Sequence, residues 1–120
     1  MQITLLGIEK NGVVKVATQG NITAAEINSA GPNPLQTTLG PTWSTMKVLM
    51  NMEGTSYIDS SAIGWLIGTS KELKTAGGML ILYGVQPGVK QVLDLLKVGR
   101  VVPIVDDESA AIELTQTDEL

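Results

Sequence analysis

The amino-acid sequence predicts an α/β fold with a mixed sheet of four to five strands, in which an N-terminal β-hairpin precedes alternating strands and helices. Two observations carry this prediction. A strong hairpin signal lies near the N-terminus, and after residue 45 short apolar runs alternate with segments of helical periodicity. Right-handed crossovers would make the later strands parallel. The chain has 120 residues, enough for one core, so we expect residues 1–120 to form a single domain.

The hairpin is predicted over residues 2–18. Polar and apolar residues alternate from Gln2 to Leu5 and again from Val14 to Val16, as in half-buried strands. Between them, Lys10-Asn11-Gly12 contains the Asn-Gly pair that favours tight hairpin turns. We therefore expect an antiparallel strand pair at one side of the sheet.

Residues 21–45 predict one or two short helical turns joined by ordered loop. Ala24 to Ile27 form the first turn, capped by Thr23, and two Gly-Pro pairs interrupt the segment further on. Either apolar residues such as Trp43 pin a surface segment to the sheet, or the segment contacts a partner. We favour the first interpretation, because surface connections vary freely.

The most informative stretch begins with an apolar run, Met46 to Met52, which is typical of a strand buried on both faces. A turn-forming patch follows at residues 53–56. Asp59, Ser60 and Ser61 then precede a helical pattern, and all three residue types favour helix N-caps. The sequence therefore places two hydroxyls and a carboxylate at the start of a helix, just past a buried strand, where ligands usually bind in open α/β sheets.

This helix is predicted to have an apolar and a polar side. Its apolar side holds Ala62, Ile63, Leu66, Ile67 and Leu73. Its other side holds Gly64, Gly68 and Lys71, and the two glycines leave a shallow groove beside Trp65. An exposed tryptophan there would suit a partner surface. The alternative is that Trp65 folds over the sheet edge and packs against the Trp43 loop.

A second buried strand and its helix are predicted next. Gly77-Gly78 ends the preceding helix, and Met79–Tyr83 reads as the strand. Pro87 suits the first turn of a helix that we expect to end at Gly99. The apolar residues at helical spacing in it are Val89, Val92, Leu93 and Leu96.

The last strand and helix are short. Residues 101–105 predict a strand, and Pro103 argues for the edge of the sheet because proline cannot donate to the ladder. Asp106, Asp107 and Glu108 then start a helix, where acidic residues complement the helix dipole. We expect residues after Thr115 to fray.

Composition excludes several classes of function. The chain has neither cysteine nor histidine, so thiolate nucleophiles, imidazole bases and metal sites built on those ligands are excluded. No phosphate-binding loop or nucleophile elbow occurs, so we expect no cofactor and no enzyme activity. A net charge of −4 with scattered basic residues argues against nucleic-acid binding. No apolar run is long enough for a membrane span and no signal-peptide pattern occurs, so we expect a cytoplasmic protein without membrane insertion.

The segment Tyr57-Ile58-Asp59-Ser60-Ser61-Ala62-Ile63-Gly64 resembles the Asp-Ser-(Ser/Thr)-Gly-(Leu/Ile)-Gly motif of STAS domains, the family of bacterial anti-sigma factor antagonists. The likeness continues at Gly77-Gly78 and at Val85-Gln86-Pro87-Gly88-Val89, which by resemblance opens a helix that ends near Leu95-Leu96. It covers roughly residues 46–114. Two departures are visible: Ala62 replaces the usual glycine, and residues 24–45 do not resemble the family's first helix. The resemblance implies a mixed sheet with helices packed mainly on one side.

The same resemblance implies roles for individual residues. Ser60, directly after the aspartate, corresponds to the family's phosphoacceptor, with Ser61 as the second candidate. The implied partner is a serine kinase that also acts as the anti-sigma factor. We expect partner contacts at Asp59, Ser61, Ala62, Gly64, Trp65 and Gly68.

A phosphate on Ser60 suits the chemistry of a helix N-terminus. Free N–H groups and the helix dipole accept the added charge of about −1.5 to −2, so the phosphate would act mainly by repelling a docked partner. The extra methyl group of Ala62 is expected to hinder approach of a kinase backbone to the Ser60 hydroxyl. A simpler interpretation is that Asp59 caps the helix and nothing is phosphorylated.

The sequence therefore predicts an anti-sigma factor antagonist that binds a kinase-type anti-sigma factor when Ser60 is unphosphorylated. The alternative is a non-phosphorylated STAS scaffold subunit of a regulatory or transport assembly. A third hypothesis, a small enzyme with Ser60 as nucleophile, lacks a histidine base. The sequence leaves the oligomeric state open.

Overall fold

The computed structural model describes residues 1–9, 12–29 and 33–117. These residues form a five-stranded sheet in the spatial order β1-β2-β3-β4-β5. The strands are β1 (Gln2–Ile8), β2 (Val13–Gln19), β3 (Lys47–Gly54), β4 (Met79–Tyr83) and β5 (Ile104–Val105). The helical segments are α1 (Ala24–Ser29), α2 (Pro34–Leu39), η1 (Trp43–Thr45), α3 (Ser60–Thr75), α4 (Pro87–Leu95), η2 (Val98–Arg100) and α5 (Glu108–Thr117).

Strand directions follow the prediction. β1 and β2 are antiparallel, with Ile8 opposite Val14, and every later neighbour is parallel. The predicted hairpin is therefore confirmed at the level of its strands, whereas its turn residues Lys10 and Asn11 lie outside the described residues. The register of β1 shifts between Leu5 and Gly7, as it does at a β-bulge.

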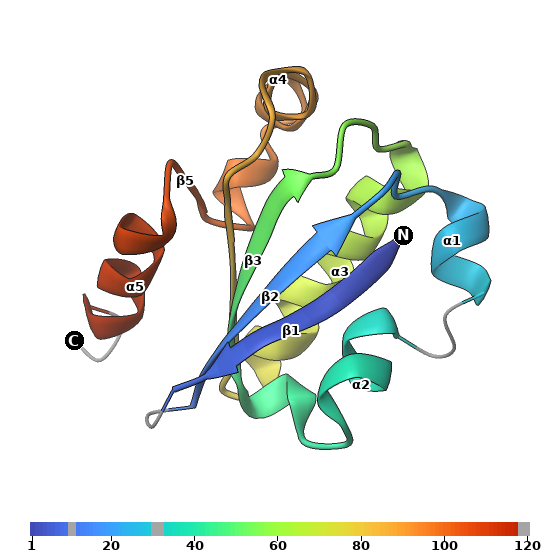
Figure 1. Ribbon diagram of the computed structural model, residues 1–120. Helices are drawn as coiled ribbons and strands as arrows, with labels where there is room; N and C mark the ends of the chain where they lie inside the picture. Colours follow the sequence, from blue (N-terminus) through green and yellow to red (C-terminus); the bar gives the residue numbers. More distant parts are fainter. Residues whose placement is uncertain (10–11, 30–32, 118–120) are drawn as a thin grey trace.

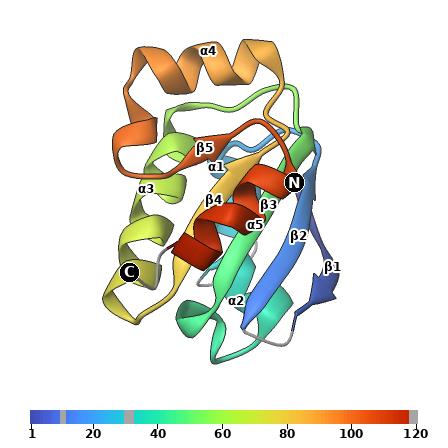
Figure 2. The ribbon, with the colours of Figure 1, turned by 90° about the vertical axis from the view of Figure 1, so that its left-hand side faces the viewer.

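Helices lie mainly on one side of the sheet, as predicted. Figure 1 shows α1, α2 and α3 on one face and α5 on the other, and Figure 2 shows α4 across one end of the sheet. Both faces of the sheet must be covered by helices, because the apolar side chains of β3 alternate between two cores. Val48, Met50 and Met52 belong to the core on the α3 side, and Leu49 belongs to the core on the α5 side.

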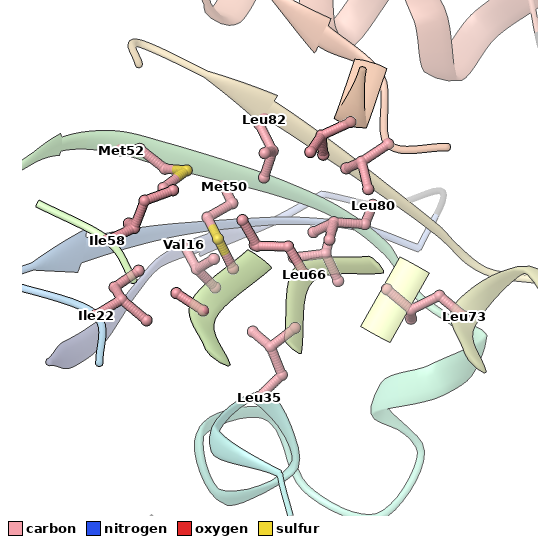
Figure 3. Close-up of a cluster of buried hydrophobic side chains, with 14 of the residues drawn as sticks. Val16, Ile22, Leu35, Met50, Met52, Ile58, Leu66, Leu73, Leu80 and Leu82 are labelled. Atoms are coloured by element: carbon pink, nitrogen blue, oxygen red, sulfur yellow. The ribbon is translucent and has the colours of Figure 1, made fainter. Parts of the chain in front are cut away.

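The α3-side core is the larger cluster. Leu66 and Leu73 of α3 pack in it together with residues of β2, β3 and β4, as the close-up in Figure 3 shows. The smaller cluster on the opposite face consists of Val13, Leu49, Ile81, Tyr83 and Ala111. Placing an apolar face of the sheet under helices on each side removes that surface from water, which is the main driving force of the fold.

Residues 21–45 form the expected short helices, within the part of this segment that the structure describes. Leu35 and Trp43 are buried, and Leu39 packs against the same core, so apolar side chains attach the segment to the domain. Pro34 does not simply interrupt the chain: it is the first residue of α2, and Asn33 caps that helix by accepting a hydrogen bond from the Leu35 amide at 2.9 Å. Proline is tolerated there because the first helical N–H has no partner within the helix.

Two expectations about the C-terminal third were wrong. α4 ends at Leu95, as the family resemblance implies, rather than at Gly99, because Lys97 adopts a left-handed conformation with φ 57°. Of the four apolar residues at helical spacing, Val89 and Leu93 are buried, whereas Val92 and Leu96 are exposed. β5 contains only Ile104 and Val105.

The last strand is short for a reason that the hydrogen bonds reveal. Pro103 contributes its carbonyl to the Leu82 amide at 2.9 Å but has no N–H to donate. β5 lies at the edge of the sheet, as Pro103 predicted. α5 then continues to Thr117, two residues beyond the expected point of fraying, and residues 118–120 lie outside the described part of the chain.

Candidate functional site

The connection between β3 and α3 is fastened to the connection between β2 and α1. The Gly20 amide donates to the Gly54 carbonyl at 3.0 Å, and the Ile22 amide donates to the Tyr57 carbonyl at 3.1 Å. The Asp59 amide in turn donates to the Ile22 carbonyl at 3.2 Å. The backbone leading into α3 is thus paired like a short extension of the sheet.

A buried side-chain pair adds to this attachment. The hydroxyls of Thr18 and Thr55 share a hydrogen bond of 2.7 Å, and both side chains are buried. Gly54 lets the two segments approach, since a Cβ atom at that position would lie 2.7 Å from the Thr18 carbonyl oxygen. The loop before α3 is therefore held in one position against the β2–α1 connection, and position 54 requires glycine for steric reasons.

Asp59 is the N-cap of α3 and also reaches a second helix. One carboxylate oxygen accepts the Ala62 amide at 2.9 Å, and the other accepts the Ala24 amide, at the first residue of α1, at 3.0 Å. These backbone donors, Ala62 first and Ala24 second, hold the pKa of the Asp59 carboxyl below its ordinary value, because they favour the charged form. The predicted cap is confirmed, and its link to α1 is an addition.

Ser60 and Ser61 occupy the first turn of α3, and both side chains are exposed. Ser60 directly follows the capping aspartate, so its hydroxyl lies at the positive end of the helix dipole. A modifying enzyme would meet this hydroxyl at the surface on an ordered backbone. The arrangement suits group transfer onto the serine.

Ala62 requires a correction. Its side chain is 0% exposed and belongs to the α3-side core, so it cannot form the expected partner contact in this structure. The methyl group packs inward between α3 and the sheet, and it does not occupy the approach to the Ser60 hydroxyl. The buried position of this methyl group argues against the expected hindrance to a kinase backbone, which remains a prediction for a kinase assay to test.

The remaining predicted contact residues divide into two kinds. Gly64 and Gly68 are exposed on α3, and a Cβ atom added to either would meet nothing within 4 Å. Trp65 is half-buried and packs against the core that contains Trp43. Its indole Nε1 is enclosed and has no hydrogen-bond partner among the residues that the structure describes. The Trp65 ring packs against the domain and does not project into solvent. Gly64 and Gly68 leave a strip of α3 backbone uncovered by side chains.

Two parts of the site were missed at the level of sequence. Tyr57 lies two residues before Asp59 and is 54% exposed, which makes it an aromatic side chain beside the serines. A lone tyrosine within a turn-rich segment is a signal that could have identified it. The Ala24 amide could not have been found this way, because a backbone donor carries no side-chain signature.

A separate depression of about 500 Å³ lies on the α5 side of the sheet and contains none of the predicted site residues. Lys15 in its wall pairs with Glu108 at 2.9 Å and with Glu9 at 3.2 Å, and hydrogen bonds to Glu108 and Glu9 raise the pKa of the lysine. Within the described ranges, no group of acidic side chains is placed to hold a metal ion. Among the residues that the structure describes, no helix is both long enough and apolar enough to cross a membrane.

Comparison with known proteins adds a family model and two curated relatives. The model described as "STAS domain" matches residues 8–111. An anti-sigma F factor antagonist of Paenibacillus polymyxa is 28% identical over 65 residues, covering 54% of this chain and 56% of that protein. One from Lysinibacillus sphaericus is 33% identical over 52 residues, covering 43% and 44%. The chain thus matches about half the length of these relatives.

Solved structures share the fold over nearly the whole chain. A candidate anti-sigma factor antagonist of Thermotoga maritima superposes with a TM-score of 0.80 at 21% identity, covering 95% of this chain and 94% of the other. The unphosphorylated anti-sigma factor antagonist SpoIIAA gives 0.70 at 20% identity, covering 96% of each chain. A sulfate transporter family protein of Wolinella succinogenes gives 0.71 at 16% identity, covering 92% and 89%. At these identities the likeness establishes the fold.

Proposed function

The chain belongs to the STAS domain family, and on that premise we propose that it is an anti-sigma factor antagonist controlled by phosphorylation of Ser60. In this proposal residues 1–120 act as one binding domain in the cytoplasm, without catalytic activity of their own. The partner is an anti-sigma factor that is also a serine kinase. The curated relatives that are named anti-sigma F factor antagonists support this choice within the family.

One observation carries the proposal: an exposed serine directly follows the N-cap of α3 on a backbone that is hydrogen-bonded to the neighbouring β2–α1 connection. Binding to such an ordered platform costs the domain little conformational entropy. The surface that a partner would meet around Ser60 consists of Tyr57, Ser61, Gly64 and Gly68, all exposed. The aromatic ring offers contact area, and the glycines let a partner backbone come close to α3.

The chemistry of the switch is transfer of the γ-phosphoryl group of ATP to the Ser60 hydroxyl. The serine Oγ–P bond forms, the bond from the γ-phosphorus to the bridging oxygen breaks, and ADP leaves. The hydroxyl proton passes to a base of the kinase, since this chain has no histidine and Asp59 is engaged with two backbone amides. Asp59 therefore positions the first turn of α3 and does not act as the base.

Phosphorylation would concentrate negative charge at one point. Phosphoserine carries about −1.5 to −2 charges near neutral pH. Beside it stands the Asp59 carboxylate, whose lowered pKa keeps it ionised. The helix dipole stabilises the phosphate, so α3 remains folded while an acidic or apolar partner surface is repelled.

Affinity capture from a lysate of the source organism tests this function. Immobilised wild-type protein is expected to retain an ATP-binding serine kinase, and the Ser60→Asp variant is expected to lose it. Ser109→Asp, which adds the same charge at an exposed position on α5, is the matched control and should behave like wild type. Equal retention of the same kinase by Ser60→Asp and wild type would contradict the switch.

A second candidate function is a scaffold subunit that is never phosphorylated. The structural likeness to the sulfate transporter family protein supports it, because the same fold occurs there in a protein whose name refers to transport. In this case Asp59 and the serines would serve only as a helix cap. Retention of transporter subunits, equally by wild type and Ser60→Asp, would favour this alternative.

A further inference from the structure

The outer edge of β1 is unpaired within the described residues. β1 is the first strand in the sheet order, and its only strand neighbour is β2. Figure 2 shows β1 at the side of the sheet, with no strand beyond it. Its seven residues therefore present backbone N–H and C=O groups to the surroundings, and another strand could pair with them.

This edge is less protected than the opposite edge, although α2 packs against β1 and a register shift interrupts the strand. β5 has two residues, follows a proline and precedes Asp106 and Asp107, which are features that discourage pairing. β1 runs from Gln2 to Ile8 without a charged residue or a proline. Leu6 is 54% and Ile8 is 66% exposed on it. The contrast between the two edges makes β1 the edge at which another strand is more able to pair.

We infer that β1 pairs antiparallel with β1 of a second copy of this chain, across a two-fold axis, to make a homodimer with one continuous sheet. A two-fold interface brings the same surface of each copy together, so it favours a surface that complements itself. An uncharged apolar strand meets this requirement. Each chain carries a net charge of −4, and all of that charge lies outside β1, so copies repel one another over other surfaces more than here.

Both faces of the joined sheet would gain apolar contacts. Leu5 and Ile8 lie opposite Val16 and Val14, residues of the α3-side core, so they share that face. Leu6 lines the depression on the α5 side, as expected for the residue after Leu5, because successive side chains of a strand point to opposite faces. The register shift between Leu5 and Gly7 shortens the regular part of the edge, so we expect a reversible dimer rather than a permanent one.

The inferred interface is separate from the proposed phosphorylation site. Ile8 pairs with Val14 near the start of β2, and Lys47 at the start of β3 pairs with Val13. Ser60 follows the other end of β3, after the connection that begins beyond Gly54. Gln2, at the other end of β1, shares the Gly54 end of the sheet through Gln19, but β2 lies between β1 and β3, so a dimer through the outer edge of β1 is on the far side of β2 from the start of α3. The inference does not depend on whether Ser60 is phosphorylated.

Sedimentation equilibrium over a range of protein concentrations tests the dimer. The wild-type mass is expected to rise from 12.7 kDa toward twice that value as concentration increases. The double variant Leu6→Lys/Ile8→Lys places like charges on both copies at the edge and should stay at 12.7 kDa throughout. Leu95→Lys, at a leucine on α4 that is 78% exposed, adds a lysine away from β1 as a control and should associate like wild type.

Two outcomes would overturn the inference: wild type that stays monomeric up to about 1 mM, or a dimer that persists in the double variant. Loss of the dimer in Leu95→Lys alone would also overturn it, by placing the interface on α4. Amide hydrogen exchange of wild-type protein gives a readout that no variant can disturb. Amides of β1 should exchange more slowly in concentrated than in dilute protein, and equal rates would contradict the pairing.

Discussion

The Asp59 carboxylate accepts a hydrogen bond of 3.0 Å from the backbone amide of Ala24, a residue 35 positions earlier in the chain. Its other oxygen caps α3 through the Ala62 amide at 2.9 Å. A single side chain therefore ties the first turn of α1 to the first turn of α3, next to Ser60. A phosphate on Ser60 would therefore place its charge next to the N-termini of both helices.

Replacing Asp59 should destabilise the domain in a pH-dependent way. Asp59→Ala removes both capping bonds and should lower the unfolding midpoint by several degrees at pH 7, with a smaller loss for Asp59→Asn, whose side chain has one acceptor oxygen instead of two. Because the folded-state pKa is lowered, the contribution is complete above the ordinary carboxyl pKa of about 4 and declines as the pH falls below it. Thermal unfolding monitored by circular dichroism at pH 7 and pH 3 measures this. Midpoint differences that are the same at both pH values would contradict the role of the ionised carboxylate.

Restoring the family glycine at position 62 should not improve modification of Ser60. Ala62→Gly removes a buried methyl group from a helix and should lower the free energy of unfolding by about 1 kcal/mol. Because that methyl faces the core, the rate of phosphorylation by a cognate kinase should stay within about twofold of wild type, a free-energy difference below RT ln 2. Denaturant titration and a phosphorylation time course measure the two effects. A clearly faster reaction in the glycine variant would mean that residue 62 contacts the kinase.

The exposed glycines of α3 should separate stability from binding. Gly64→Ala and Gly68→Ala add a methyl group where nothing lies within 4 Å, and each should stabilise the helix by up to about 1 kcal/mol. If a partner backbone packs on this strip, the same variants bind that partner more weakly while unfolding at higher denaturant. Gly54→Ala is the contrasting variant, since its Cβ would lie 2.7 Å from the Thr18 carbonyl oxygen and should destabilise. Unchanged partner affinity in both α3 variants would remove the strip from the interface.

Neighbouring residues Trp65 and Leu66 should respond very differently to substitution. Leu66 is fully buried, and Leu66→Ala should cost about 2–5 kcal/mol through lost contacts and a cavity. Trp65→Phe removes an enclosed indole N–H that has no hydrogen-bond partner among the described residues, which offsets the loss of ring contacts. We expect a net change below about 1 kcal/mol for Trp65→Phe, measured by urea unfolding. A loss as large as that of Leu66→Ala would show that the indole makes an essential contact.

The elements that could be predicted from sequence are those with strong local signals. Asp59-Ser60-Ser61 defined the start of α3, and the apolar runs from Met46 and Met79 defined the central strands. The helical wheel also placed Ala62 on the apolar side, correctly, whereas the motif carried over from the family resemblance made it a contact residue. Periodicity within this chain was the better guide to which way that side chain points.

Features that depend on tertiary contacts could not be predicted. The bond between Asp59 and Ala24 joins segments whose proximity only the folded sheet creates. In α4, the spacing of the apolar residues is compatible with more than one buried face. Leu96 lies outside the core because the helix ends before it, with Lys97 in a left-handed conformation. Local propensity does not encode such choices, because packing against the rest of the domain makes them.

The most direct test of the proposed switch is intact-mass measurement and peptide mapping after incubation with ATP and a lysate of the source organism. We expect one added phosphate, absent from Ser60→Ala and retained in Ser61→Ala, since Ser61 shares the exposed first turn of α3 and serves as the matched control. No phosphate under any growth condition of the lysate would contradict the account. A phosphate that survives in Ser60→Ala and is lost in Ser61→Ala would contradict Ser60 as the acceptor and assign the phosphate to Ser61, whereas absence of any phosphate would leave Asp59-Ser60-Ser61 as a helix cap.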